Sequence, residues 1–385
     1  MPPSPFAAQG QHLSASHGSP RGRYYHPELD ALRFFAFLLV FLTHVGPEFA
    51  RFNRAMFDVS FAGGFGVPLF FTLSSFLITE LLLREREKTG TIDVRAFLIR
   101  RILRIWPLYF VFLIFGIIYT RAHGYAVPRL LVISYFTLSA NWYCAFRGFP
   151  ATFISPLWSI SIEEQFYLIW PSCARLAGRR GLLVLAVICW FLFLPSLALL
   201  GPVDFLRTWP DSFVQFQFFA LGAFLAMAIH RKVLHIPTVA RLAILAAGLL
   251  SFYGAARYMH TLPNGFRSFA PGYFFIQIGC LLLLLGTYDL HEPTGFLRRP
   301  FNAIVWLGRI SYGLYVIHIF ALHVVEHAFA SVRHTQELPT LFNMLVQVAV
   351  ALVVTIFLSA LSYRFLERPF LQLKQHFTVI RSRPD

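Results

Sequence analysis

The chain has 385 residues, of which 57% are apolar and 13% charged, and its formal net charge is +15. A soluble domain carries roughly 25% charged residues, so this composition excludes an ordinary water-soluble globular protein. The basic residues lie in short clusters between apolar runs, as in the cytoplasmic loops of membrane proteins, and not on a nucleic-acid-binding surface. We therefore predict an all-α fold, a polytopic helix bundle in a membrane, and no nucleic-acid partner.

The N-terminal residues 1–27 are rich in Pro, Ser, Gly and His and contain no apolar core. They lack the features of a cleavable signal peptide, so we predict a disordered cytoplasmic tail. The transmembrane domain is expected over 28–370. Residues 371–385 are expected to form a basic cytoplasmic tail.

About ten segments are long and apolar enough to be transmembrane helices, each of which needs roughly 20 residues. They are 29–48, 64–83, 105–120, 157–174, 181–200, 212–229, 240–256, 270–288, 303–328 and 341–366. Basic residues place the loops 84–104 and 175–180 in the cytoplasm, and the two long segments between these loops already give an even number of crossings. The short apolar segment 128–140 is therefore expected not to span the membrane, and both termini are expected to be cytoplasmic.

The first span carries Arg33 and His44, about three helical turns apart, so both should lie on one face, about 16 Å from each other along the axis. Asp30 is one turn before Arg33 and can pair with it. Ionisable groups at membrane depth usually face the bundle interior. The alternative is that Arg33 anchors the helix at the interface and His44 is only a polar residue near the helix end.

Further along, Glu163 and Glu164 open an apolar segment. Adjacent helical positions point about 100° apart, so at least one carboxylate should face inward, and Glu163 shares its face with Tyr167. The alternative is that both acids are solvated at the outer interface. Trp142, in the preceding loop, can stack on the ring of a bound ligand, or it can belong to an interfacial aromatic belt.

Near the C-terminus, Ser311, Tyr315 and His318 form one stripe on a helix. A stripe of polar side chains in an apolar helix is a candidate for a functional site, and the alternative is hydrogen bonding that only holds the bundle together. Arg100, Arg101 and Arg104 lie at the cytoplasmic end of another span. Arginine suits bidentate phosphate binding, as in a coenzyme A thioester, although topology or anionic lipid explains the same charges.

The four cysteines have no CxxC spacing, and neither a disulfide framework nor a zinc site is indicated. We expect no bound metal and no resident cofactor. The sequence makes no prediction of oligomeric state.

In chain order, several motifs resemble those of the acyltransferase 3 family of membrane-bound O-acyltransferases, over residues 26 to 372. They are ELDALRFFAFLLVFLTH with its Arg-x10-His spacing, FFTLSSFLI, RRILRIWPLY, PLWSISIEEQFYLIWP, ISYGLYVIH and YRFLERPF. The family usually has Gly where this chain has Ser75, from which we expect a modest change in helix packing. No esterase-like soluble domain follows in this sequence, so a stand-alone membrane domain is expected.

The resemblance implies transfer of an acyl group, usually acetyl from acetyl-CoA, to a hydroxyl of a sugar, surface polysaccharide, lipo-oligosaccharide or macrolide, in a bacterial inner membrane. A neutral histidine, with an unperturbed pKa of about 6.5, suits the removal of the hydroxyl proton. The predicted catalytic residues are His44 as general base, Glu163, which orients the imidazole or binds acceptor hydroxyls, and Arg33, which helps to hold the anionic donor. Arg100, Arg101 and Arg104 are predicted to bind acyl-CoA, and Tyr167, Tyr315, His318 and Trp142 to bind the acceptor.

Two alternatives remain from the residues alone. Transfer can be direct, or it can pass through an acylated His44 or serine, in which case the kinetics would be ping-pong. A glycan or lipid transporter, with the buried charges lining a path, would move its substrate without consuming acyl-CoA.

Overall fold

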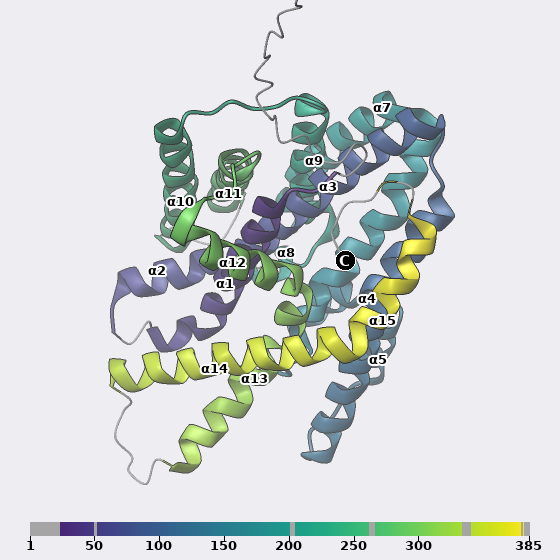
Figure 1. The fold of residues 1–385 in the computed structure, drawn as a ribbon. Helices are drawn as coiled ribbons and strands as arrows, with labels where there is room; N and C mark the ends of the chain where they lie inside the picture. The colour runs from purple at the N-terminus through teal and green to yellow at the C-terminus, as the bar shows by residue number, and fades with distance from the viewer. Residues whose placement is uncertain are drawn as a thin grey trace, which may run out of the picture.

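The computed structural model describes residues 24–49, 52–200, 205–261, 266–332, 340–378 and 380. Within these ranges every regular element is a helix and none is a strand, which confirms the all-α prediction. The predicted disordered tail therefore lies almost wholly outside the described residues, and so does the end of the predicted basic tail. The long helices cross one another in a bundle (Figure 1). In chain order, the α-helices, long and short, are α1 (Pro27–Phe49), α2 (Arg54–Gly63), α3 (Gly66–Thr89), α4 (Val94–Ala122), α5 (Arg129–Phe136), α6 (Ala140–Arg147), α7 (Trp158–Leu200), α8 (Phe205–Thr208), α9 (Ser212–Ile229), α10 (Thr238–Thr261), α11 (Phe266–Thr287), α12 (Arg298–Arg309), α13 (Ser311–Val332), α14 (Leu341–Ser362) and α15 (Arg368–Lys374).

Eight segments of the described chain are long and apolar enough to cross a membrane. They are Arg54–Thr89, Val94–Ala122, Ser155–Leu199, Ser212–Ile229, Thr238–Met259, Phe269–Thr287, Ser311–Ala330 and Leu341–Phe377. Large apolar side chains on the outer faces of α4 and α7 are exposed, among them Ile118 at 62% and Val184 at 59%. Such surfaces suit contact with lipid, so the polytopic bundle is confirmed, while the number of ten crossings stays a prediction.

The segment Ser155–Leu199 consists of two helices joined at Gly178. Gly178 has φ 61° and ψ −152°, a backbone conformation that favours glycine. A Cβ at this position would stand 3.0 Å from the guanidinium carbon of Arg86, whose Nη1 donates to the carbonyl of Ala174 at 2.6 Å. The break falls in the basic loop 175–180 and separates the two spans predicted on either side of it.

The predicted span 303–328 is corrected by the structure, which divides this segment between α12 and α13. The break lies at Ile310, and the candidate crossing begins at Ser311. The apolar residues before the break belong to the amphipathic helix α12, which packs along α1 so closely that a Cβ on Gly308 would overlap the carbonyl oxygen of Asp30. The segment 128–140, in contrast, contains the eight-residue helix α5, which is too short to span a membrane, as predicted.

Helices α3 and α9 form the centre of the bundle, and most of their residues are buried. α3 also contacts α1, α7 and α11, while α10 pairs with α11 at one edge and α13 with α14 at another (Figure 1). Ser75, the residue that replaces a family glycine, is buried and donates a hydrogen bond to the carbonyl of Phe219 in α9. The departure from the family pattern thus adds a polar contact between the two central helices.

The close approach of α3 and α9 gives a stability prediction. A Cβ on Gly222 would lie 2.1 Å from the carbonyl oxygen of Thr72, a backbone atom that cannot turn aside. Gly222→Ala should therefore reduce stability by about 1–3 kcal/mol and lower the thermal unfolding temperature in detergent. Gly254→Ala in α10 is the matched control, because no atom lies within 4 Å of its added methyl group. Unfolding of Gly222→Ala at the wild-type temperature would contradict this packing.

Candidate active site

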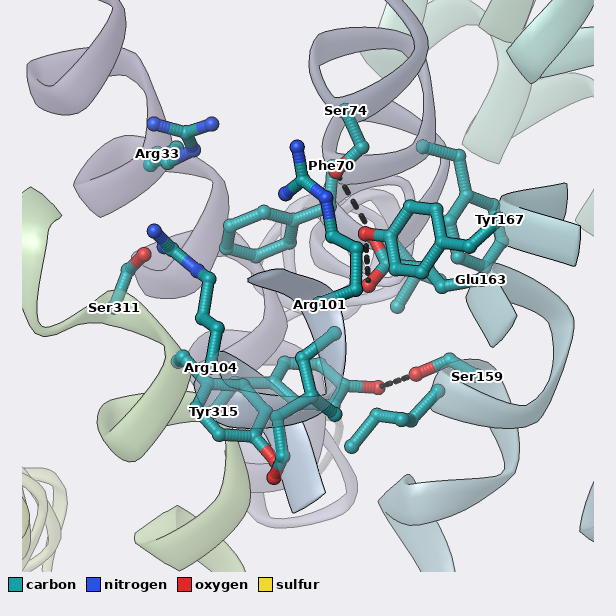
Figure 2. A pocket seen from close by; sticks show the side chains of 15 residues that line it. Arg33, Phe70, Ser74, Arg101, Arg104, Ser159, Glu163, Tyr167, Ser311 and Tyr315 are labelled. Atoms are coloured by element: carbon teal, nitrogen blue, oxygen red, sulfur yellow. Dashed lines mark hydrogen bonds between the residues drawn. The ribbon is translucent and has the colours of Figure 1, made fainter. Parts of the chain in front are cut away.

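A cavity of about 90 Å³ lies between α1, α3, α4, α7 and α13. Its polar walls come from helices that are far apart in the sequence, and Figure 2 shows the guanidinium groups of Arg33, Arg101 and Arg104 turned toward a common space. We call it the arginine cavity. It is lined by Arg33, Val67, Phe70, Phe71, Ser74, Arg101, Arg104, Ile105, Ser159, Ile160, Glu163, Tyr167, Ser311, Tyr312 and Tyr315.

A second cavity, of about 70 Å³, adjoins the first. Both are lined by Ser74 and by the same three arginines, so these side chains stand between the two spaces. The second cavity also has Tyr24, Asp30 and Lys374 in its wall. It lies at the end of the bundle where the sequence predicts the cytoplasm, and together the two cavities form a basic path from that end into the interior.

Arg33 is held in place by the first helical turns of α1. Its Nη1 donates to Asp30 Oδ1 at 2.7 Å, which confirms the predicted pair. The other carboxylate oxygen of Asp30 accepts from the Tyr25 hydroxyl at 3.2 Å. Asp30 is almost fully buried, so the arginine supplies the countercharge that a carboxylate inside the bundle requires.

Glu163 occupies the opposite wall of the arginine cavity. Its two carboxylate oxygens accept hydrogen bonds from Ser74 at 2.9 Å and from Tyr167 at 3.1 Å (Figure 2). The positive charges that act on it are those of Arg101 and Arg104. Glu164 is buried as well, and Trp106 donates to it at 3.4 Å. The alternative that both acids are solvated at an interface is therefore wrong, and both face the protein interior.

His44 does not line either cavity. Its Nδ1 lies 2.8 Å from the carbonyl oxygen of Val40 and 3.3 Å from Nε2 of His318, which comes from α13. His44 is exposed, whereas His318 is fully buried. The two rings meet edge to face with their centroids 4.9 Å apart. The candidate base thus has a histidine neighbour that its position in the sequence does not reveal.

Tyr315 lies between the arginine cavity and the histidine pair. Its ring packs against Phe70 at 6.0 Å and against His318 at 5.7 Å. Its hydroxyl lies 2.7 Å from the Ser159 hydroxyl and donates to the Pro156 carbonyl at 3.1 Å. Of the predicted stripe on α13, Ser311 and Tyr315 face the cavity, and His318 lies beyond them.

Besides the histidine pair, two more of the predicted site residues, Arg100 and Trp142, line neither cavity. Arg100 lies 3.4 Å from a carboxylate oxygen of Glu85 and donates to the carbonyl of Phe377. Trp142 stacks on Phe146 in α6. Glu163 also bonds to Ser74 and Tyr167 instead of His44. The donor-binding role of Arg100 and the acceptor-binding role of Trp142 stay predictions.

Some cavity residues had no distinguishing sequence signal. Phe70 opens the motif FFTLSSFLI, but it is one of 44 phenylalanines, and its position in the wall depends on its contact with Tyr315 of α13. Ser159 and Tyr312 belong to the quoted motifs, but a hydroxyl in an apolar helix does not indicate on its own which helix it faces. Only the packing of the helices shows that these residues line the cavity.

Comparison with known proteins assigns the family. The model of the acyltransferase 3 family, described as an acyltransferase domain, matches residues 26–364. Peptidoglycan O-acetyltransferase OatA of Listeria monocytogenes is 27% identical, over 90% of this chain and 56% of that protein. The protein named "Putative peptidoglycan O-acetyltransferase YrhL" of Bacillus subtilis is 30% identical, over 90% of this chain and 55% of its own length. A Staphylococcus aureus protein named "Putative O-acetyltransferase" is 28% identical, over 94% and 59%. No solved structure matches the chain.

The chain therefore belongs to the acyltransferase 3 family, as its motifs predicted, and it is a multi-pass membrane protein. It spans a little more than half the length of the curated relatives that it matches.

The hydrogen bonds to Glu163 give a second prediction. Ser74→Ala and Tyr167→Phe each leave one carboxylate oxygen of Glu163, in the cavity wall, without the donor described above, so each should lower the free energy of unfolding by about 1–2 kcal/mol. Ser172→Ala, also in α7, is the control, since that hydroxyl donates to the carbonyl of Leu168 one turn earlier, at 3.0 Å. Thermal unfolding in detergent compares the variants. Equal unfolding temperatures for all three would show that the two bonds do not stabilise the site.

Proposed function

We propose that the chain is an O-acetyltransferase that moves an acetyl group from a coenzyme A thioester to a hydroxyl of a cell-surface glycan. The names of two relatives favour peptidoglycan as that glycan, ahead of other polysaccharides, lipo-oligosaccharides and macrolides. We place the enzyme in the inner membrane of a bacterium, with both termini in the cytoplasm. The donor enters from the cytoplasm, and it is a substrate, not a resident cofactor.

The observation that carries this proposal is the convergence of Arg33, Arg101 and Arg104 on one internal cavity. A guanidinium group inside a membrane bundle costs free energy, and such groups usually bind a ligand or pair with an opposite charge. The donor's nucleotide carries several phosphates, for which arginine offers bidentate hydrogen bonds. Asp30 and Glu163 balance part of the positive charge, and the positive charge that remains suits an anionic group that arrives and departs.

The chemistry assigned to His44 is general-base catalysis. Its Nε2 takes the proton of the acceptor hydroxyl, the oxygen bonds to the thioester carbonyl carbon, and the carbon–sulfur bond breaks. The proton then passes to the leaving thiolate. Because His44 is exposed while the arginine cavity lies on the far side of Tyr315 and Phe70, the acceptor approaches His44 from the outer face, and the acyl arm reaches past these two rings.

A covalent route uses the same residues. The acetyl group would first bond to His44, with release of the thiol, and then move to the acceptor in a second step. Initial-rate kinetics separate the routes, because a ping-pong pattern favours the covalent intermediate and a sequential pattern favours direct transfer.

The test uses membranes that contain the protein, acetyl-CoA labelled in the acetyl group, and a panel of acceptors that includes peptidoglycan fragments, polysaccharides and macrolides. Label should appear on a glycan, and His44→Ala should reduce the rate about 10²–10⁴-fold. Undiminished transfer by folded His44→Ala would contradict the assignment of the base. Movement of a glycan with no consumption of acetyl-CoA would contradict the enzyme and favour a transporter.

Three arginine variants test the donor site in the same assay. Arg101→Gln and Arg104→Gln should each raise the KM for acetyl-CoA about 10- to 100-fold, since each removes charge-assisted hydrogen bonds. Arg100→Gln is the comparison, because it removes the same charge from the same helix at a side chain that lines neither cavity, and a wild-type KM in this variant would exclude the predicted donor-binding role of Arg100. An equal rise in KM for all three would assign donor binding to diffuse positive charge and not to the cavity.

A further inference from the structure

The contact between His44 and His318 joins helices α1 and α13, and the two residues are 274 positions apart in the chain. Three short distances define it. Nδ1 of His318 lies 2.6 Å from the carbonyl oxygen of Tyr315, its Nε2 lies 3.3 Å from Nδ1 of His44, and that Nδ1 lies 2.8 Å from the carbonyl oxygen of Val40. The rings are therefore connected in a chain that begins and ends at a backbone carbonyl.

The carbonyls determine which ring nitrogens carry protons. A carbonyl oxygen only accepts, so Nδ1 of His318 must carry the hydrogen that Tyr315 receives. In the neutral ring, Nε2 of His318 is then an acceptor, and it faces Nδ1 of His44. Nδ1 of His44 carries the hydrogen that is shared between Val40 and His318. The remaining nitrogen of His44, Nε2, holds the lone pair.

The position of His318 is fixed by packing. Its side chain has no exposed surface, and its ring meets Phe37 edge-on at 6.1 Å. A residue with no exposed surface cannot touch an acceptor that approaches from outside, so the predicted acceptor-binding role does not suit it. Among the described residues, no carboxylate is hydrogen-bonded to either ring, and the Glu163 oxygens are bonded to Ser74 and Tyr167.

We propose that His318 is a positioning residue for the acyl transfer, and that it holds His44 in the tautomer whose Nε2 can take the acceptor proton. This inference rests on the proposed role of His44 as general base. When Nε2 of His44 gains the hydroxyl proton, the ring becomes an imidazolium that donates from Nδ1 to the lone pair of His318. His318 gains and loses no proton in the cycle. It fills the place that a carboxylate occupies in a Ser-His-Asp triad, with a neutral acceptor.

The experiment compares three substitutions in the full-length protein. His318→Leu removes the acceptor and keeps an apolar side chain. His318→Gln keeps an amide oxygen that can accept from His44. His327→Leu is the control on the same helix, because His327 is exposed and its Nδ1 lies 2.9 Å from the carbonyl of His323 one turn earlier.

The expected result is a fall in kcat of about 10- to 100-fold for His318→Leu, with the KM of both substrates unchanged, since a hydrogen bond to a charged ring is lost. His318→Gln should recover most of the lost rate, and His327→Leu should match the wild type. Equal losses in the Leu and Gln variants, or a wild-type kcat in His318→Leu, would overturn the proposal. If His318→Leu does not fold, His318→Asn replaces it. The asparagine side chain is polar, but it is too short for its amide oxygen to accept a hydrogen bond from His44.

The double variant with His44→Ala separates this inference from the proposed function. If His318 acts only through His44, His318→Leu should cause no further loss in the His44→Ala background. Losses that multiply would overturn the positioning role and leave the base assignment intact. Full activity of His44→Ala would overturn both.

Discussion

Ionised side chains inside a membrane bundle must find countercharges or hydrogen-bond partners, and this constraint organises the structure. Arg33 is held by Asp30 at 2.7 Å, and Glu163 by two hydroxyls and the charges of two arginines. These groups come from helices α1, α3, α4 and α7, so the need to satisfy the charges constrains how these helices pack. The arginine cavity is the space that this arrangement leaves, and a polyanionic donor can complete its charge balance.

The same arrangement separates the arginines proposed to bind the donor from His44, the residue proposed to accept the proton. The arginines open toward the end predicted to be cytoplasmic, and His44 is exposed beyond Phe70 and Tyr315. The hydroxyl of Tyr315 bonds to Pro156, at the start of the segment that carries Glu163. Tyr315 therefore connects the segment that carries Glu163 to α13, the helix that also carries His318. In this account an acyl group can meet an acceptor without either substrate crossing the whole bundle.

Features that depend on spacing within one helix could be predicted from the sequence. Contacts between helices could not, because they depend on tertiary packing. The Asp30–Arg33 pair and the inward position of Glu163 follow from spacing within one helix. The common face of Arg33 and His44 was also inferred, yet a separation of about 16 Å along the helix puts only Arg33 in the cavity. Arg100 and Arg101 are adjacent and chemically identical, and only the packing of α4 shows which one turns inward. The contact between His44 and His318 joins distant helices, and no local pattern predicts it.

The most direct test of this account is transfer measured from each side of the membrane. Sealed vesicles with one known orientation of the protein receive labelled acetyl-CoA on one side only, and a glycan acceptor that cannot cross the bilayer is placed on the opposite side. The account predicts label on the acceptor only when acetyl-CoA is supplied on the side of the arginine cavity. With the double variant Arg101→Gln/Arg104→Gln, it predicts strongly reduced labelling at acetyl-CoA concentrations below the wild-type KM. Equal labelling from either side, or a wild-type rate of labelling by the double variant at these concentrations, would contradict it.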